Sequence, residues 1–133
     1  MELIIGGYAQ GKLDYVLLKY HLQEEDVWNG VLPEESVLRK KTGTGNVKTV
    51  MNRFHDWVRT RIQKGGCPEE EILSFLDRHD DCIIISDEIG NGIVPAEPFE
   101  REYRERTGRI LVQLAERAEG VERVICGIGQ KIK

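Results

Sequence analysis

The chain has 133 residues, of which 40% are apolar and 32% charged, and its net charge at neutral pH is −4. These values are typical of a folded domain, so we predict a single domain over residues 1–133. The negative charge argues against a nucleic-acid-binding surface, which needs a cationic stripe. No apolar run approaches the roughly 20 residues that span a bilayer, and no signal peptide is visible, so we expect a cytoplasmic protein without a membrane span.

The three cysteines form no CxxC pair, so neither a disulfide framework nor a zinc site is predicted. Cys82 and Cys126 lie in or beside apolar runs, and we expect both to be small hydrophobic residues of the core. The histidines, His21, His55 and His79, are scattered without the spacing of metal ligands. We expect each of them to be structural.

In chain order, the apolar pattern first predicts a strand at residues 3–5. A helix is predicted from Gly11, because apolar residues recur after it at i, i+3, i+4 and i+7. A short second strand is predicted at residues 27–28. Pro33 and the glycine-rich stretch 42–46 then predict an irregular connection.

The middle of the chain predicts two further strands with helices between them. The first strand is expected at residues 47–51 and the helix after it at residues 54–62. Pro68 opens another helix, because proline is favoured in the first helical turn. Residues 82–85 are the strongest strand signal in the chain. Their lack of alternation predicts a central parallel strand that is covered on both faces.

The last predicted helix runs from residue 98 to residue 118, with Gly120 as its C-terminal cap and a strand at residues 121–126 after it. Its interleaved arginines and glutamates predict a solvated face with ion pairs one turn apart. Gly108 inside this helix costs stability, and the close approach of another backbone is one reason for a glycine there. Strands that alternate with helices predict an α/β fold, whose ligands bind at the carboxyl ends of the strands.

The segment after the first strand matches GxxxxGK, the phosphate-binding loop or P-loop. The predicted nucleotide-binding residues are Gly6, Gly7, Tyr8, Ala9, Gln10, Gly11, Lys12 and Leu13. The glycines let backbone N–H groups turn toward a phosphate, and Lys12 reaches the outer phosphates, which makes it a predicted catalytic residue. We therefore predict a P-loop NTPase-like three-layer sandwich with a mostly parallel central sheet that binds a nucleotide. A glycine-rich turn with an exposed lysine is the alternative interpretation.

The predicted magnesium site departs from the usual P-loop pattern at one position. Active P-loop enzymes have Ser or Thr after the lysine, where the hydroxyl binds Mg²⁺, but this chain has Leu13. The strand at residues 82–85 is followed by Asp87 and Glu88, as in a Walker B element. We predict both as Mg²⁺ ligands and Glu88 as a catalytic residue. A solvated pair of acids at a strand end is the alternative.

Two blocks of the chain resemble the adenosylcobinamide kinase/adenosylcobinamide-phosphate guanylyltransferase family. Residues 3–12 resemble the opening GGxxSGKS segment of that family. The second block comprises residues 85–95, Arg104, Gly108 with Arg109, and residues 126–133. Members of the family read (S/T)NE(V/I)GxGIVP, RxxxGR and SGxxxKxK there.

This resemblance implies a P-loop fold and a two-step activity. The family phosphorylates the aminopropanol hydroxyl of adenosylcobinamide with ATP or GTP, and then transfers GMP from GTP to that phosphate through a guanylylated histidine. The resemblance thus implies a nucleoside triphosphate and an adenosylcobinamide-type corrinoid as ligands. It also implies a homo-oligomer with sites formed between subunits.

Parts of the family pattern are missing from this chain. The HxxxRPxxW context of the nucleophilic histidine is not found, and residues 31–46 form a shorter connection in its place. We therefore assign the nucleophile to none of the three histidines. A strand-end acid followed five positions later by Trp matches Asn52 and Trp57, so the acid has become an amide.

Three hypotheses remain open from the sequence. The first is an enzyme of corrinoid salvage, in which Lys12 and Glu88 act on the nucleotide. The second is a non-catalytic nucleotide-binding regulator or inactive subunit, which the losses at Leu13 and Asn52 favour. The third is an interaction module whose P-loop is only structural.

Overall fold

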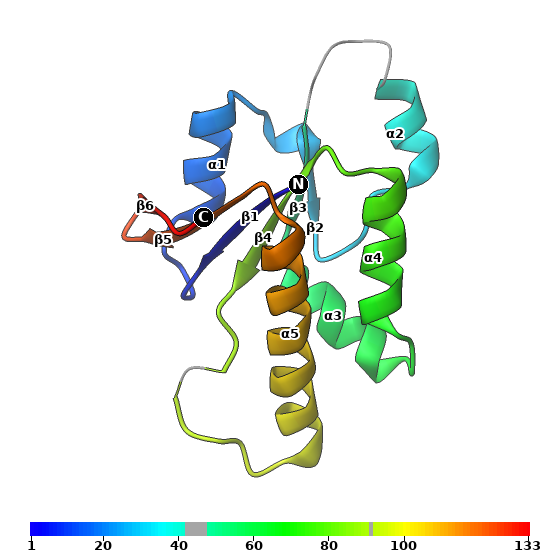
Figure 1. Ribbon diagram of the computed structural model, residues 1–133, viewed down its shortest axis with the longest axis vertical. Coiled ribbons are helices and arrows are strands. Elements are labelled where there is room, and N and C mark those ends of the chain that lie inside the picture. Colours follow the sequence, from blue (N-terminus) through cyan, green and yellow to red (C-terminus); the bar gives the residue numbers. More distant parts are fainter. Residues whose placement is uncertain (42–47, 91) are drawn as a thin grey trace.

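The computed structural model describes residues 1–41, 48–90 and 92–133 (Figure 1). The connection predicted at residues 42–46 lies outside the described residues. Within the described part, no helix is long and apolar enough to cross a membrane. The elements are β1 (Glu2–Gly6), α1 (Lys12–Tyr20), the 3₁₀ turn η1 (Glu24–Asp26), β2 (Val27–Asn29), α2 (Glu35–Lys41), β3 (Thr49–Asn52), α3 (Phe54–Gln63), α4 (Pro68–Arg78), β4 (Cys82–Asp87), α5 (Pro98–Arg117), β5 (Gly120–Ile125) and β6 (Ile128–Lys131).

Within the described residues, the strands form one six-stranded sheet in the order β2-β3-β4-β1-β5-β6. All neighbours are parallel except β5 and β6, which form an antiparallel hairpin. Figure 1 shows α1 apart from α3, α4 and α5, which lie together on the other side of the sheet. The predicted α/β sandwich with a mostly parallel sheet and a central β4 is confirmed.

Consecutive side chains of the inner strands enter two separate cores. In β4, Ile84 packs with residues of α3, α4 and α5, whereas Ile83 and Ile85 pack with the residues around α1. In β1, Leu3 packs in the core with Ile84, and Ile4 packs in the core with Ile83 and Ile85. Successive strand side chains point to opposite faces, so a strand covered on both faces needs an unbroken apolar run. This is why the apolar run at residues 82–85 identified the central strand.

Several sequence expectations are wrong in detail. Helix α5 ends at Arg117 with Ala118 as its cap, and Gly120 instead begins β5. Cys82 is buried as expected, but Cys126 is exposed in the turn between β5 and β6. A Cβ added at Gly108 would meet nothing within 4 Å, so the described residues show no close backbone approach there.

Two elements were missed because their signals are weak. Helix α2 lies in the connection that was expected to be irregular, and it is short. Strand β6 follows the last predicted strand after a two-residue turn, and it is polar and mostly exposed. An edge strand of this kind lacks the apolar run that marks a buried strand.

The charged face of α5 was only partly predicted. Arg106 pairs with Glu102 and Arg109 with Glu105, each one turn apart as expected. Arg101 donates to the carbonyl oxygens of Pro95 and Ala96 instead, and Arg104 donates to those of Gly90 and Ile93. These two arginines therefore stabilise the loop between β4 and α5 through hydrogen bonds to its carbonyl oxygens.

We predict that Ile84→Ala lowers the free energy of unfolding by about 2–5 kcal/mol, because it leaves a cavity in a packed core. The Ile84 side chain has 0% exposure at the centre of the sheet. Chemical denaturation measures the change. The matched control is Ile128→Ala in β6, where the side chain is 72% exposed. This control should change stability by less than about 0.5 kcal/mol. Equal losses in the two variants would contradict the central position of β4.

An ion pair between α4 and α5 predicts a pH-dependent part of the stability. Arg106 donates to both carboxylate oxygens of Glu69, over 2.8 and 2.9 Å, and holds the pKa of that carboxyl at about 2, below its usual 4.5. Because the folded-state pKa is depressed, the stabilisation is present above about pH 4.5 and lost as the pH falls toward 2. Glu69→Gln should therefore lower the unfolding free energy at about pH 6, and the difference from the wild type should vanish near pH 2.

Urea titrations at both pH values test this prediction. Glu105→Gln is the control, because Glu105 pairs with Arg109 on the exposed face of α5. Such surface pairs contribute about 0–1 kcal/mol. A Glu69→Gln effect that persisted unchanged at low pH would contradict the assignment.

Candidate nucleotide-binding site

The end of β1 and the end of β4 meet at one edge of the sheet. The strands are parallel neighbours, and Gly6 is aligned with Asp87. A Cβ on Gly6 would lie 2.5 Å from the carbonyl oxygen of Val124 in β5, so only glycine fits where β1 ends. The P-loop and the acid at the end of β4, Asp87, therefore meet at the carboxyl edge, where α/β proteins bind ligands.

A pocket of about 620 Å³ opens at this edge, a size that suits a small-molecule ligand. Seven of the predicted site residues line it: Tyr8, Ala9, Gln10, Gly11, Lys12, Leu13 and Asp87. Gly6, Gly7 and Glu88 are not among the lining residues. The remaining lining residues are Asp14, Asn52, Arg53, His55, Asp56 and Ile85.

The P-loop wraps around the side chain of Lys12. Ala9 and Gly11 have positive φ angles of 53° and 82°, and Gly11 is the N-cap of α1. The Lys12 ammonium donates to the carbonyl oxygen of Gly7 over 2.6 Å and lies 2.7 Å from Oδ1 of Asp87. Lys12 is only 8% exposed, so the alternative of an exposed lysine on a glycine-rich turn does not describe this loop.

The turn between β5 and β6 supports the P-loop from outside. The side-chain oxygen of Gln10 accepts the N–H of Cys126 over 2.8 Å. The carbonyl oxygen of Gln10 accepts the N–H of Gly127, also over 2.8 Å. A Cβ on Gly11 would lie 3.4 Å from Cα of Gly127, so the turn packs directly on the loop. The C-terminal hairpin is thus part of the structure that shapes the pocket.

His55 connects α3 to the end of β4. Its Nδ1 accepts the N–H of Asp87 over 3.0 Å, which leaves Nε2 as the protonated nitrogen of the neutral ring. Nε2 lies 3.4 Å from Oδ2 of Asp87 and 3.6 Å from Oδ1 of Asp56. Burial lowers the pKa of His55, and the two carboxylates oppose that shift.

Three residues that line the pocket, Arg53, His55 and Asp56, were not predicted as site residues. They come from the N-cap and first turn of α3, directly after β3. Arg53 has a φ of 56°, which is uncommon for a residue other than glycine. Their position after a parallel strand was the available signal, because all such segments meet at the carboxyl edge.

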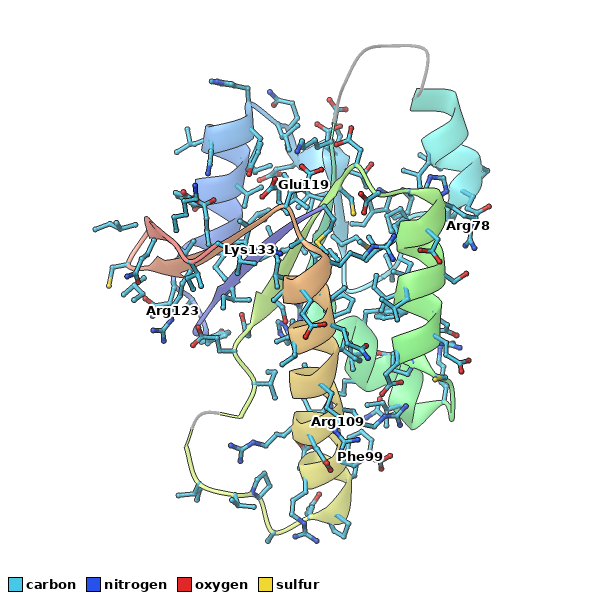
Figure 2. The ribbon with its side chains drawn as sticks, viewed as in Figure 1. Arg78, Phe99, Arg109, Glu119, Arg123 and Lys133 are labelled. Carbon is cyan, nitrogen blue, oxygen red and sulfur yellow. The ribbon has the colours of Figure 1, made fainter. Side chains whose placement is uncertain are left out.

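The two predicted metal ligands point in different directions. Asp87 faces the pocket, whereas the Glu88 carboxylate pairs with Arg123 of β5, with 2.7 Å between Oε1 and Nε. Figure 2 shows Arg123 near the end of β1. The amide of Asn52 donates to Oδ1 of Asn29 over 2.8 Å, linking the ends of β2 and β3.

The residues of the pocket could supply only a few of the ligands of a magnesium ion. Within the described residues, no three His, Cys, Asp or Glu side chains are grouped as ligands of a metal ion. Nucleotide-bound Mg²⁺ needs fewer protein ligands than this, because it uses one or two carboxylates together with phosphate oxygens and water. Asp87 fits this requirement and Leu13 does not. Glu88 as a metal ligand stays a prediction.

A glycine-rich loop between β1 and α1, a lysine within it and an acid at the end of the adjacent parallel strand define a P-loop NTPase-like α/β fold. The family model described as "Cobinamide kinase / cobinamide phosphate guanyltransferase" matches residues 42–132, more than half of the chain. The chain belongs to this family. The match begins after the P-loop, so the P-loop assignment rests on its own motif and geometry.

Two curated relatives are each called "Bifunctional adenosylcobalamin biosynthesis protein CobU". The protein from Escherichia coli strain K12 is 43% identical over 51 residues, which are 38% of this chain and 28% of the relative. The protein from Salmonella typhimurium strain LT2 is 41% identical over 51 residues, with the same coverage. The chain thus aligns with 28% of the length of these relatives.

We predict that Gln10→Ala loosens the turn between β5 and β6, because it removes the acceptor for the Cys126 N–H. Hydrogen exchange at Cys126 should become faster, while exchange in the core strand β4 should not change. Gln113→Ala is the control, since Gln113 is exposed on α5 and is not among the residues that line the pocket. Unchanged exchange at Cys126 would show that the side chain of Gln10 does not hold the turn.

Proposed function

We propose that the chain binds ATP or GTP in the pocket at the carboxyl edge and acts as an adenosylcobinamide kinase in corrinoid salvage. The observation that carries this proposal is the position of Lys12, whose ammonium lies inside the P-loop and beside Asp87. Family membership supports cobinamide as the acceptor. A single domain over residues 1–133, a cytoplasmic location and a homo-oligomer remain part of this proposal.

The residues of the pocket would act mainly through charge and position. The N–H groups of the loop and the N-terminus of α1 favour the binding of phosphate. Lys12 would leave its contact with Gly7 to neutralise the outer phosphates, and Asp87 would keep the ammonium oriented. Phosphoryl transfer depends mostly on such positioning and charge stabilisation. Mg²⁺, when bound with the nucleotide, would supply further charge neutralisation, and Asp87 would hold it.

Transfer of GMP has weaker support in this chain. His55 lines the pocket, but its Nδ1 accepts the Asp87 N–H and its Nε2 faces two carboxylates. Neither nitrogen is directed away from these partners as an attacking nucleophile must be. We therefore assign His55 no nucleophilic role, and the guanylyltransferase step stays the less supported part of the proposal.

A nucleotide-binding protein without catalysis is the second candidate. The apolar side chain of Leu13 lines the pocket where active P-loop enzymes have a hydroxyl, and the Asn52 amide replaces a carboxylate. Incubation with adenosylcobinamide and radiolabelled ATP or GTP separates the two candidates. Labelled adenosylcobinamide phosphate supports the kinase, and nucleotide binding without product supports the second candidate.

We predict that Lys12→Met weakens ATP or GTP binding about 10–100-fold. Loss of a hydrogen bond to a charged group costs about 1.5–3 kcal/mol, and methionine keeps the buried stem of the side chain. Calorimetric titration measures the affinity. Lys19→Met is the control, because Lys19 lies in the same helix but pairs with Glu122 outside this pocket. If Lys12→Met bound nucleotide as tightly as the wild type, the proposed site would have to be abandoned.

A further inference from the structure

Asp56 brings a further carboxylate to the pocket, beside those of Asp87 and Asp14, from a position that the sequence motifs did not indicate. It lies in the first turn of α3, four residues after Asn52 at the end of β3. The backbone turns into the helix at Arg53, the N-cap, and Asp56 is the third residue of α3. Asp56 and Asp87 consequently line the same pocket although they come from different strand–helix connections.

One oxygen of each carboxylate lies near the same atom of His55. Oδ1 of Asp56 lies 3.6 Å and Oδ2 of Asp87 lies 3.4 Å from the same Nε2 atom of His55. The two oxygens are therefore within about 7 Å of each other. The imidazole N–H faces both oxygens, so the two acids lie close together in the pocket.

The other oxygen of each acid contacts a cationic side chain. Oδ2 of Asp56 accepts from Nε of Arg53 over 2.7 Å, and Oδ1 of Asp87 lies 2.7 Å from the Lys12 ammonium. Arg53 and Lys12 both line the pocket, as does a third acid, Asp14, so two cations and three carboxylates line the space that phosphates would enter. Glu88 is not among the residues that line this pocket, and its carboxylate pairs with Arg123.

We propose that Asp56 is the partner of Asp87 in holding nucleotide-bound Mg²⁺, in place of the acid that is absent at position 52. This inference rests on the proposed binding of ATP or GTP. The competing explanation is structural: an acid in the first turn of a helix interacts favourably with the helix dipole, and Asp56 also pairs with Arg53. The experiment must separate these two roles.

Calorimetric titration with ATP, in Mg²⁺ and in EDTA, measures the ratio of the two affinities for each variant. The wild type should bind more tightly in Mg²⁺, and Asp56→Asn should reduce the ratio about tenfold or more, because loss of groups around a bound metal typically costs about 10–100-fold in affinity. The affinity in EDTA should change less than the affinity in Mg²⁺.

Glu71→Gln is the matched control. Glu71 is also a first-turn acid paired with an arginine, and its side chain is 35% exposed, as is that of Asp56. It lies outside the pocket and should keep the wild-type ratio. A second variant, Asn52→Asp in the Asp56→Asn background, returns a carboxylate to the position that the family pattern predicts. It should restore much of the Mg²⁺ dependence.

The outcomes distinguish this inference from the proposed function. If the wild type binds no nucleotide, the proposed function fails and the inference with it. If the wild type binds ATP but ignores Mg²⁺, or if Asp56→Asn keeps the wild-type ratio, only the inference is overturned. Should Asp56→Asn fail to fold, carboxyl-detected NMR of the wild type decides. Mn²⁺-ATP should broaden the Asp56 and Asp87 resonances more than that of Glu88, and broadening of Asp87 and Glu88 without Asp56 would overturn the inference.

Discussion

The parallel pairing of β1 with β4 is the constraint on which the rest of the site depends. It aligns Gly6 with Asp87, and so brings the loop after one strand against the acid at the end of the other. The Lys12 ammonium then lies between the Gly7 carbonyl and the Asp87 carboxylate. A buried ammonium without an opposite charge would be costly, so this contact stabilises the loop in a shape that can receive phosphate. Neither residue could hold this position if the two strands were not neighbours.

The surrounding elements each support that arrangement from a different side. The turn between β5 and β6 binds Gln10 through two backbone N–H groups, and β5 provides Arg123 as the partner of Glu88. The first turn of α3 contributes His55, which holds the backbone of Asp87. On the far side of the loop after β4, Arg104 binds two carbonyl oxygens. Segments from the start, middle and end of the chain thus meet at one edge of the sheet.

Sequence patterns predicted the elements that carry strong periodicity or strong motifs. The apolar run at residues 82–85 identified β4 correctly, and the GxxxxGK motif placed the loop and Lys12. The polar edge strand β6, the short helix α2 and the exposure of Cys126 were not predicted, because short or half-exposed segments carry little periodic signal. The sequence motif did not distinguish the roles of Asp87 and Glu88, because only the fold shows that Asp87 lines the pocket and that Glu88 pairs with Arg123.

The α/β architecture, the P-loop motif and the membership of a cobinamide-processing family could be inferred from the sequence, because these depend on local motifs and on the order of apolar segments. The tertiary structure decided which side chains share the pocket. Arg53, His55 and Asp56 have no motif of their own, and they reach Lys12 and Asp87 only because β3, β4 and β1 lie side by side with their carboxyl ends at one edge. That proximity arises from strand pairing between distant parts of the chain, which no local pattern of residues encodes.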